Sequence, residues 1–201
     1  WQPPPRPGPL VLAGRSVRLE PLAPAHAAPL HAAFAGHDAL WDCMAYGPFD
    51  AAGYAAWVAA RAGQEDPMFA AVIPAGGTPA GMLALMRIEA GAGVVEIGHV
   101  CLAPALQRTV AATEAIHLAT AHVFALGYRR LEWKCGARNT ATRRAALRLD
   151  FAVFRQHMFV KGRNRDTAWF AMTDGDWQCG LAAAHRRWLD PAHFDASGQQ
   201  R

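Results

Sequence analysis

Short apolar runs alternate along the chain with stretches in which apolar residues recur every three or four positions, the spacing of a helix. Apolar, β-branched runs predict strands, and helical repeats bounded by Asp, Asn, Thr, Pro or Gly predict helices. The predicted strands begin near residue 16 and then cover residues 68–73, 80–89, 94–102, 130–135, 151–161 and 167–173. The predicted helices cover residues 24–34, 51–61, 109–126, 139–149 and 177–189. This order, βααβββαβαββα, predicts a mixed α/β sheet with one parallel crossover in the middle.

The chain is organised around a strand that turns sharply into a helix, in residues 94–126. Pro104 ends the strand, and Thr109 is a typical N-cap residue for the helix that follows. The first N–H groups of a helix have no partner within it and attract an anion. Because Ala111 and Ala112 are small and Arg108 stands beside them, we expect the start of this helix to bind a phosphate group.

Composition narrows the class of protein. With 201 residues, 52% of them hydrophobic and 18% charged, the chain is long and apolar enough for one domain with its own core. Residues 1–13 are proline-rich and predict an extended arm or a disordered end, residues 14–195 a single domain, and residues 196–201 a tail. No apolar run reaches the roughly 18 residues of a membrane span, and the first residues lack a signal-peptide pattern. The expectation is a cytoplasmic protein without membrane contact.

Charge and metal-binding residues exclude two further classes. The net charge of +4 is mild and the basic residues form no run, so nucleic acid is not an expected partner. The four cysteines form no C-x-x-C pair, and the nine histidines are scattered. His117 and His122 lie five apart on one predicted helix and therefore point to different faces. No metal site is expected.

Several segments together resemble one family. Residues 107–112 (QRTVAA) are similar to the Gln/Arg-x-x-Gly-x-Gly/Ala loop of the GNAT superfamily of N-acetyltransferases, with Val110 at the first glycine. Residues 139–142 (NTAT) and 149–151 (LDF) resemble the Asn-x-x-Ser and Leu-Gly-Phe segments of that family, with Asp150 at the glycine. The resemblance covers roughly residues 14–195, and residues 165–167 with Trp177 favour the RimJ/RimL-like branch, the ribosomal-protein-alanine acetyltransferases.

The resemblance implies a GNAT-like acyl-CoA N-acyltransferase fold. Its central sheet is mostly antiparallel, contains one parallel pair of strands that splay apart, and is flanked by helices. Acetyl-CoA would be the co-substrate, with its pyrophosphate at the start of the central helix, its pantetheine arm at Asn139, and no metal. A backbone N–H near residues 100–102 would stabilise the oxyanion. The residues predicted to bind the cofactor are Val100, Cys101, Leu102, Gln107, Arg108, Thr109, Val110, Ala111, Ala112, Thr113, Asn139, Thr142 and Arg144.

Acetyl transfer to an amine also needs proton transfer, because a free alkylamine has a pKa of about 10 and is mostly charged at neutral pH. Glu96, near the start of the central strand, is the first candidate for the base, with a surface or capping role as the alternative. Glu132 on the next strand is the second candidate. Many members of the family protonate the leaving thiolate with a tyrosine, but Ala146 stands at that position. Thr142 stands at the family's serine, so it either hydrogen-bonds the thiolate or is an ordinary residue of the first helical turn.

These observations predict an N-acetyltransferase that moves an acetyl group from acetyl-CoA to a primary amine by direct attack in a ternary complex. The acceptor would be a small molecule or a protein N-terminus. The alternative is a non-catalytic acyl-CoA-binding or interaction domain of the same fold, motivated by Val110, Asp150 and Ala146.

Aromatic residues raise two further expectations. Those of the N-terminal helices are expected mostly in the core, with one or two lining the acceptor groove. They are Trp41, Tyr46, Phe49, Tyr54 and Trp57. Trp169, Phe170 and Trp188 are candidates for the apolar face of a homodimer.

Val110 gives a geometric prediction. A β-branched residue with positive φ would be a steric outlier, whereas glycine adopts such a conformation freely. We therefore predict a negative φ at Val110, a place in the first turn of the helix, and a side chain that points away from the phosphate.

Overall fold

The computed structural model describes residues 1–155, 159–160, 163–164 and 166–195. Its strands are β1 (Leu12–Ala13), β2 (Val17–Pro21), β3 (Met68–Pro74), β4 (Gly81–Glu89), β5 (Val94–Leu102), β6 (Arg130–Gly136), β7 (Ala152–Arg155), β8 (Phe159–Val160), β9 (Arg163–Asn164) and β10 (Thr167–Thr173). Its α-helices are α1 (Ala27–Phe34), α2 (Ala51–Arg61), α3 (Val110–Ala125), α4 (Thr140–Arg148), α5 (Asp174–Asp176) and α6 (Ala182–Trp188). Short 3-10 turns lie at Pro24–His26, Asp38–Trp41, Ala90–Ala92 and Pro191–His193.

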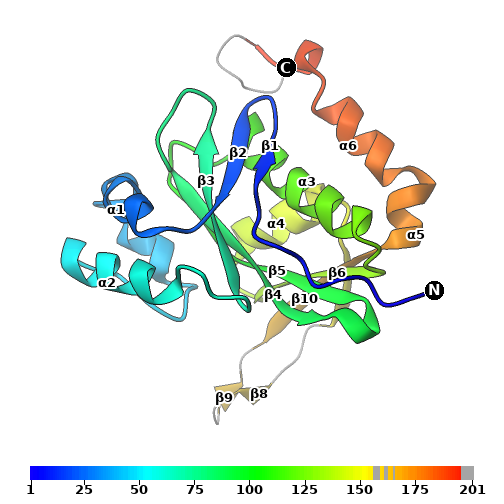
Figure 1. Ribbon diagram of the computed structural model, residues 1–201, viewed down its shortest axis with the longest axis horizontal. Coiled ribbons are helices and arrows are strands. Elements are labelled where there is room, and N and C mark those ends of the chain that lie inside the picture. Colours follow the sequence, from blue (N-terminus) through cyan, green and yellow to red (C-terminus); the bar gives the residue numbers. More distant parts are fainter. Residues whose placement is uncertain (156–158, 161–162, 165, 196–201) are drawn as a thin grey trace.

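Within the described residues, eight strands form one twisted sheet in the order β1-β2-β3-β4-β5-β6-β10-β7, and β8 pairs separately with β9 (Figure 1). β5 and β6 run parallel, whereas the other neighbouring strands are antiparallel. Helices α1 and α2 cover one face of the sheet, and α3, α4 and α6 lie on the other (Figure 1). The predicted mixed sheet with one parallel pair and flanking helices is confirmed.

The central strands are buried on both faces, which explains why β3 is a continuous apolar run rather than an alternating one. One core packs α3 and α4 against side chains such as Leu83 and Ile97. The other packs α1 and α2 against side chains such as Phe69 and Met82. The sheet therefore separates two apolar layers, and a side chain on β4 or β5 enters one or the other according to its place in the strand.

The parallel pair separates in its second half. Pairing of β5 with β6 ends at Ile97 and Trp133. Beyond that point β5 continues beside β4 as far as Leu102, while β6 continues beside β10 as far as Gly136. Because no further β5–β6 pair is found among the described residues, the two strands splay apart there.

A β-bulge lies on β5 where the splay begins. Met82 is opposite Cys101 and Ala84 is opposite Gly98, so β5 carries one more residue than β4 across this interval. His99 lies inside the bulge and has a φ of 51°, a left-handed conformation that is uncommon for a residue other than glycine. The bulge re-aims the side chain of His99 relative to a regular strand.

The N-terminal arm is packed on the domain. Leu10 is 1% exposed in the core beneath α3, and β1 pairs with β2, so the sheet begins inside the segment predicted as an arm. Glu114 of α3 accepts hydrogen bonds from the N–H groups of Arg15 (2.9 Å) and Ser16 (2.7 Å), which ties the β1–β2 turn to α3. The expectation of a disordered end is therefore wrong for these residues. The tail at residues 196–201 lies outside the described residues.

The last helical segment begins earlier than predicted. Thr173 is an N-cap whose Oγ1 accepts the N–H of Asp176 at 3.1 Å, so helical structure starts at Asp174 instead of Trp177. A π-helical turn at Trp177–Leu181, with Gly180 at a φ of 154°, joins α5 to α6. The hairpin predicted from residues 151–161 and 167–173 is seen in the pairing of β7 with β10, and part of its predicted turn lies outside the described residues.

Candidate active site

The start of α3 presents backbone N–H groups beside small side chains. Thr109 is the N-cap as predicted, and its Oγ1 accepts a hydrogen bond from the N–H of Ala112 at 3.2 Å. Among the described residues, the N–H groups of Val110 and Ala111 have no hydrogen-bond partner. Unpaired N–H groups at a helix start, together with the helix dipole, attract an anion.

The left-handed residue of this loop is Arg108, with a φ of 63°, and not Val110. Val110 is the first residue of α3 and is not one of the residues with positive φ, so the predicted negative φ is confirmed, and its side chain is buried. The exposed Arg108 is free to meet a negative charge, and Gln107 ties the loop to the end of β5 because its Nε2 donates to the carbonyl of Leu102 at 2.9 Å.

The residues predicted for the oxyanion, Val100, Cys101 and Leu102, all lie beyond the last β5–β6 pair. The side chain of Cys101 packs with the aromatic core of α1 and α2, whereas that of Val100 packs against the core beneath α3. Burial raises the pKa of Cys101 to about 12, so the thiol stays protonated at neutral pH. The splayed segment thus offers backbone rather than reactive side chains.

The start of α4 brings two predicted residues together beside β6. Asn139 is the N-cap, and its Oδ1 accepts the N–H of Thr142 at 3.0 Å, so this oxygen is used by the helix. Thr142 is half-buried in the first turn, and Arg144 is exposed. Asp150, which stands where the family has glycine, adopts a left-handed φ of 61°, a conformation that Asp tolerates better than most residues.

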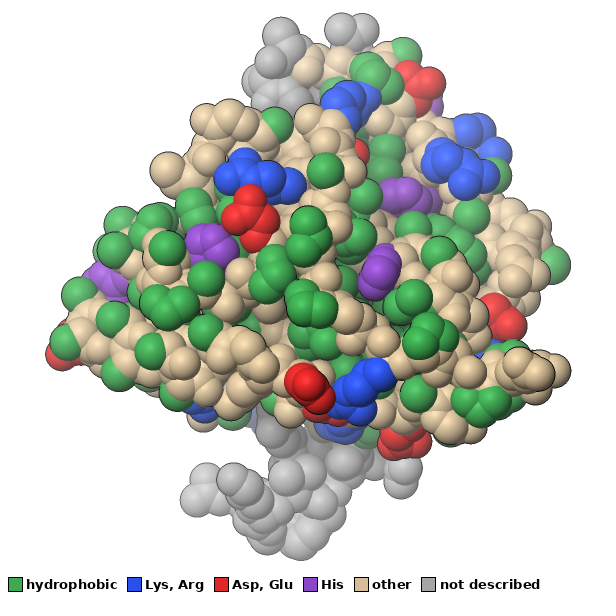
Figure 2. Space-filling view, in the orientation of Figure 1, with side chains coloured by type: hydrophobic (Ala, Val, Ile, Leu, Met, Phe, Trp, Pro, Cys, Tyr) green, Lys and Arg blue, Asp and Glu red, His purple; other side chains and the backbone are tan. Residues whose placement is uncertain are grey.

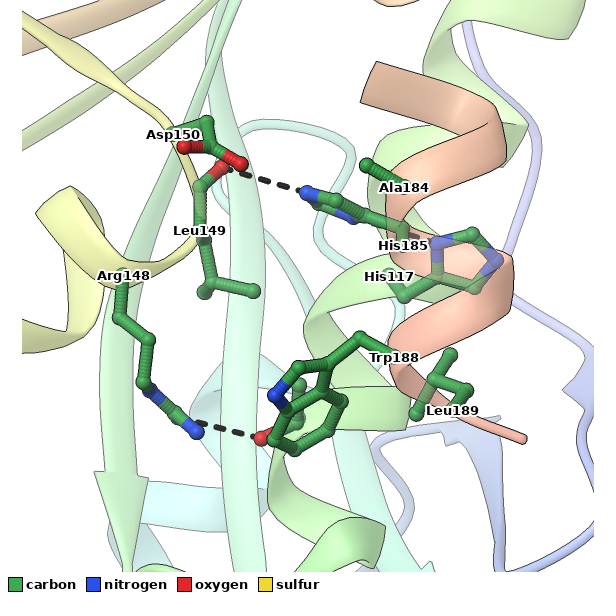
Figure 3. Close-up of a pocket in the computed structure, with 9 residues that line it drawn as sticks. His117, Arg148, Leu149, Asp150, Ala184, His185, Trp188 and Leu189 are labelled. Carbon is green, nitrogen blue, oxygen red and sulfur yellow. Dashed lines mark hydrogen bonds between the residues drawn. The ribbon is translucent and has the colours of Figure 1, made fainter. Parts of the chain in front are cut away.

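A hollow adjoins the first turn of α3, between α3, the end of α4 and α6 (Figure 3). Its empty volume is about 470 Å³ including the part open to solvent. Arg148 spans one side: its Nη2 donates to Thr113 Oγ1 at 3.1 Å, and its guanidinium lies 5.3 Å from the centre of the Trp188 ring. The hollow therefore combines a cation, an indole ring and a hydroxyl close to the start of α3.

Two histidines close the inner side of the hollow. His117 and His185 approach with their Nδ1 atoms 3.4 Å apart, and His185 Nε2 lies 3.3 Å from the carbonyl oxygen of Leu149 (Figure 3). A carbonyl only accepts, so Nε2 of His185 carries a proton, its Nδ1 accepts, and Nδ1–H of His117 donates. Burial lowers the pKa of both histidines, with that of His117 at about 4. Both are therefore neutral at neutral pH.

The two carboxylates considered as bases are cross-strand neighbours in the paired part of β5 and β6. Glu96 is 3% exposed and forms an ion pair with Arg87 of β4. Glu132 is 7% exposed and forms an ion pair with Arg130 at 2.6 Å. Two adjacent carboxylates repel each other, and each arginine offsets part of that repulsion. The surface alternative for Glu96 is wrong, because the residue is buried in an ion pair.

His99 is a candidate that no sequence motif indicated. Its Nδ1 lies 3.0 Å from the hydroxyl of Tyr46, and the two rings stack with centroids 5.6 Å apart. Burial lowers the pKa of His99, and the nearby Arg61 lowers it further. The available signal was a histidine within the apolar run of residues 94–102. That signal is weak because a lone histidine in a strand is usually part of the core.

The N-terminal aromatic residues divide between core and site. Trp41, Tyr54 and Trp57 are buried, and Tyr54 stacks on Trp57 with an interplanar angle of 9°. Tyr46 and Phe49 are half-buried, and Tyr46 reaches across to β5. Phe170, predicted at a dimer face, is fully buried in the core and unavailable for such a face.

A family model described as the acetyltransferase (GNAT) domain matches residues 16–152. The chain therefore belongs to the GNAT acetyltransferases. No curated protein matches the chain in sequence.

Solved structures agree with this assignment. The chain is 44% identical to a GCN5-related N-acetyltransferase from Brucella melitensis, with a TM-score of 0.91 and coverage of 100% of this chain and 94% of that one. It is 39% identical to a GNAT-family acetyltransferase from Chromobacterium violaceum, with a TM-score of 0.78 and coverage of 89% and 93%. Two more distant structures share the fold. One is the microcin C7 self-immunity acetyltransferase MccE in complex with acetyl-CoA and AMP, with 18% identity, a TM-score of 0.68 and coverage of 80% of this chain and 93% of that one. The other is RimL, the ribosomal L7/L12 α-N-protein acetyltransferase, with 19% identity, a TM-score of 0.68 and coverage of 81% and 93%.

The described residues contain neither a helix suited to a membrane nor a cluster suited to a metal ion. None of these helices is long and apolar enough to cross a membrane. No group of three or more His, Cys, Asp and Glu side chains in the same part of the chain is arranged to hold a metal ion. On the face seen in Figure 2, Lys and Arg side chains lie in several separate groups among hydrophobic and neutral ones.

Proposed function

We propose that this protein is an N-acetyltransferase that transfers the acetyl group of acetyl-CoA to a primary amine by direct attack in a ternary complex. The main observation in support is that β5 and β6 splay apart beyond Ile97 and that β5 then leads into the start of α3. A thioester arm can enter a splayed strand pair and bond to backbone groups that a paired strand would use internally. The helix start then supplies N–H groups for the pyrophosphate.

The cofactor would lie along elements adjacent in the fold. The pyrophosphate would meet the unpaired N–H groups of Val110 and Ala111 at the start of α3, with Arg108 supplying positive charge. The pantetheine arm would run through the splay beside Asn139, and the nucleotide end would occupy the hollow lined by Arg148 and Trp188. Arg148 supports this path, because it contacts Thr113 in the first turn of α3 and also lies over the indole of Trp188.

The amine would approach from the opposite face, under α1 and α2. Attack on the carbonyl carbon places negative charge on the carbonyl oxygen, and an N–H of residues 100–102 would stabilise it. The thiolate would leave near Thr142, whose hydroxyl can donate a hydrogen bond to sulfur. Glu96 remains a candidate base, although its ion pair with Arg87 occupies the carboxylate. The acceptor would be a small-molecule amine or a protein N-terminus, as in the RimJ/RimL-like branch.

The alternative is a non-catalytic domain that binds acyl-CoA. Val110, Asp150 and Ala146 motivate it, because each departs from the family's motif. The first two departures are accommodated by the backbone, since Val110 is helical and Asp150 adopts the left-handed conformation of the missing glycine. These observations favour the catalytic proposal.

Two measurements test the proposal. Acetyl-CoA at about 100 times its Kd should stabilise the native state by about 2.7 kcal/mol, which corresponds to a rise in Tm of roughly 5–10 °C for a domain of this size. A screen of amines should then identify an acceptor that makes the protein release free CoA. No change in Tm with acetyl-CoA or other acyl-CoAs contradicts the cofactor proposal. A rise in Tm without CoA release from any amine favours the non-catalytic alternative.

A further inference from the structure

The strongest unassigned feature is the contact between His99 and Tyr46. His99 comes from the bulge of β5 and Tyr46 from the loop before α2, so residues far apart in the sequence meet at the beginning of the splay. The Nδ1 of His99 lies 3.0 Å from the Tyr46 hydroxyl, and the ring planes are within 23° of parallel. Phe69 of β3 also packs on the imidazole, with its ring centre 4.9 Å from that of His99. The imidazole is therefore held by a hydrogen bond to Tyr46, by stacking on the Tyr46 ring and by packing against Phe69.

The other ring nitrogen is available. Among the described residues, Nε2 of His99 has no hydrogen-bond partner, and it does not belong to the buried polar atoms that lack one. The left-handed backbone at His99 is a strained conformation, and strain of this kind gathers at functional sites. A fixed ring with one tethered nitrogen and one open nitrogen is the arrangement that a general base requires.

Glu96 differs from His99 in the state of its acceptor group and in its place along β5. Its carboxylate forms an ion pair with Arg87, and its residue lies in the part of β5 that is still paired with β6. His99 lies two residues beyond the last pair, where the strands have separated. Both side chains are on the same strand, but only His99 combines a free acceptor atom with a place at the splay.

We propose that His99 is the base that takes the proton from the attacking amine, and that Tyr46 is a positioning residue that holds its ring. This inference rests on the proposed acetyltransferase function. Tyr46 would accept the Nδ1–H of His99 through its phenol oxygen, which leaves the lone pair on Nε2.

His99 takes its proton after the amine has attacked the thioester. The amine attacks in its neutral form, after its ammonium proton has passed to water. Its nitrogen lone pair bonds to the thioester carbon, and the C=O electron pair moves to the oxygen. Nε2 of His99 removes the proton from the positively charged nitrogen of this adduct. The oxygen electron pair then re-forms C=O as the C–S bond breaks and CoA leaves as a thiolate. The proton on Nε2 passes to the thiolate or to water, which returns His99 to its neutral form.

The charged and titratable groups that act on the imidazole and on Tyr46 come from α2 and β5. Arg61 of α2 acts on both His99 and Tyr46, whereas Cys101 of β5 and Tyr54 of α2 act on Tyr46. Burial and Arg61 both lower the pKa of His99, so the ring is neutral at neutral pH and becomes protonated only in acid. A base must be unprotonated, so kcat is expected to fall as the pH is lowered through the pKa of His99, below about 6.5.

His99→Asn is the main test, because Asn tolerates the left-handed backbone and has no comparable base. With the best amine from the screen, this variant should lose about 10²-fold in kcat, retain its Tm rise with acetyl-CoA, and lack the acidic limb of the kcat profile. His37→Asn changes an exposed histidine and serves as the matched control. Glu96→Gln is the comparison variant, and its loss should be at least tenfold smaller than that of His99→Asn.

Tyr46→Phe separates positioning from packing. Phe keeps the stacked ring but cannot accept the Nδ1–H, so the imidazolium loses a stabilising partner. The acidic limb should move to lower pH, and kcat should fall several-fold. Unchanged pH dependence in Tyr46→Phe would mean that Tyr46 only packs.

Two outcomes overturn the assignment of the base. One is a His99→Asn enzyme that keeps more than about a third of its kcat or keeps the acidic limb. The other is loss of that limb in Glu96→Gln alone. If His99→Asn does not fold, His99→Gly suits the same φ, and millimolar imidazole should restore its activity. Absence of rescue in a folded His99→Gly that binds acetyl-CoA also contradicts the proposal.

A spectroscopic measurement keeps this inference separate from the proposed function. Nitrogen NMR of the His99 ring in the acetyl-CoA complex should show a protonated Nδ1 and a bare Nε2. The reverse tautomer removes the lone pair from Nε2 and overturns the proposal, whatever the amine screen finds. Absence of CoA release, by contrast, contradicts the proposed function.

Discussion

The two faces of the sheet contribute to the candidate site in different ways. On the α3 face, the groups suited to the cofactor are the backbone N–H groups of two consecutive residues, Val110 and Ala111, with Arg108 beside them. On the α1 and α2 face, the groups suited to the acceptor are side chains from separate elements, such as Tyr46, Phe69 and His99. One half of the site is local in sequence and built from backbone, and the other is assembled by the fold.

This difference sets what a substitution can do on each side. A backbone N–H survives a change of side chain, so single substitutions at the start of α3 should have small effects unless they alter the backbone or its charge. On the acceptor face the functional groups are side chains, so a substitution there removes the functional group itself. On the cofactor side, substitutions on α3, α4 and α6 can test this contrast.

The largest expected effect concerns the histidine pair on the α3 face. The folded pKa of His117 is about 4, below its unfolded value of about 6.5, so the unfolded chain binds more protons between these values. The stabilising contribution is complete above about pH 6.5 and is lost as the pH falls towards 4. His185 acts in the same direction. We expect His117→Gln, which still donates to His185 but does not titrate, to reduce the loss of unfolding free energy between pH 6.5 and 4.5 by about 1–2 kcal/mol, a value discounted because His117 is half-exposed.

Chemical denaturation at the two pH values measures this difference, and His37→Asn is the control. An equal loss in wild type and His117→Gln would mean that the pair is protonated without cost.

The second prediction concerns Arg148 and the hollow. Arg148→Ala removes the cation over Trp188, so acetyl-CoA should bind about tenfold more weakly, a change of about 1.4 kcal/mol. S-acetylpantetheine lacks the nucleotide and should bind the variant and the wild type equally. Arg187→Ala, on the exposed side of α6, is the matched control, and calorimetry measures each Kd. Equal weakening of both ligands would place the nucleotide end away from the hollow.

The same contrast explains what the sequence could predict. The strand–turn–helix unit was predictable because its determinants are neighbours: β5 ends before Pro104, Thr109 caps α3, and small residues follow. The N-caps Asp50 and Asn139 were predictable for the same reason. The mixed sheet followed from the order of such local units.

The contacts on the acceptor face could not be predicted from the sequence, because the residues that make them are distant in sequence. Nothing within a few residues of Tyr46 indicates that its hydroxyl meets His99, 53 positions later. The ion pair of Glu96 with Arg87 likewise depends on the register of β4 with β5. Leu10 looked like part of a loose arm because prolines dominate its surroundings, whereas its burial depends on contacts beneath α3.

The smallest expected effect on acetyl-CoA binding is at Val110, and it tests most directly whether the cofactor half is built from backbone. Val110 is helical and buried, so its N–H can serve an anion while its side chain stays within the fold. Val110→Gly should therefore change the Kd for acetyl-CoA by less than about threefold, which is below 0.7 kcal/mol. It should nevertheless lower the unfolding free energy by about 2 kcal/mol, because a buried side chain is lost and the first turn becomes more flexible. Calorimetry and chemical denaturation on the same preparation give both values. A gain of more than about tenfold in affinity would mean that valine obstructs the phosphate, which would strengthen the non-catalytic alternative. A loss of that size would mean that the glycine variant no longer holds the helix start in place, so that the side chain, and not the backbone alone, forms this half of the site.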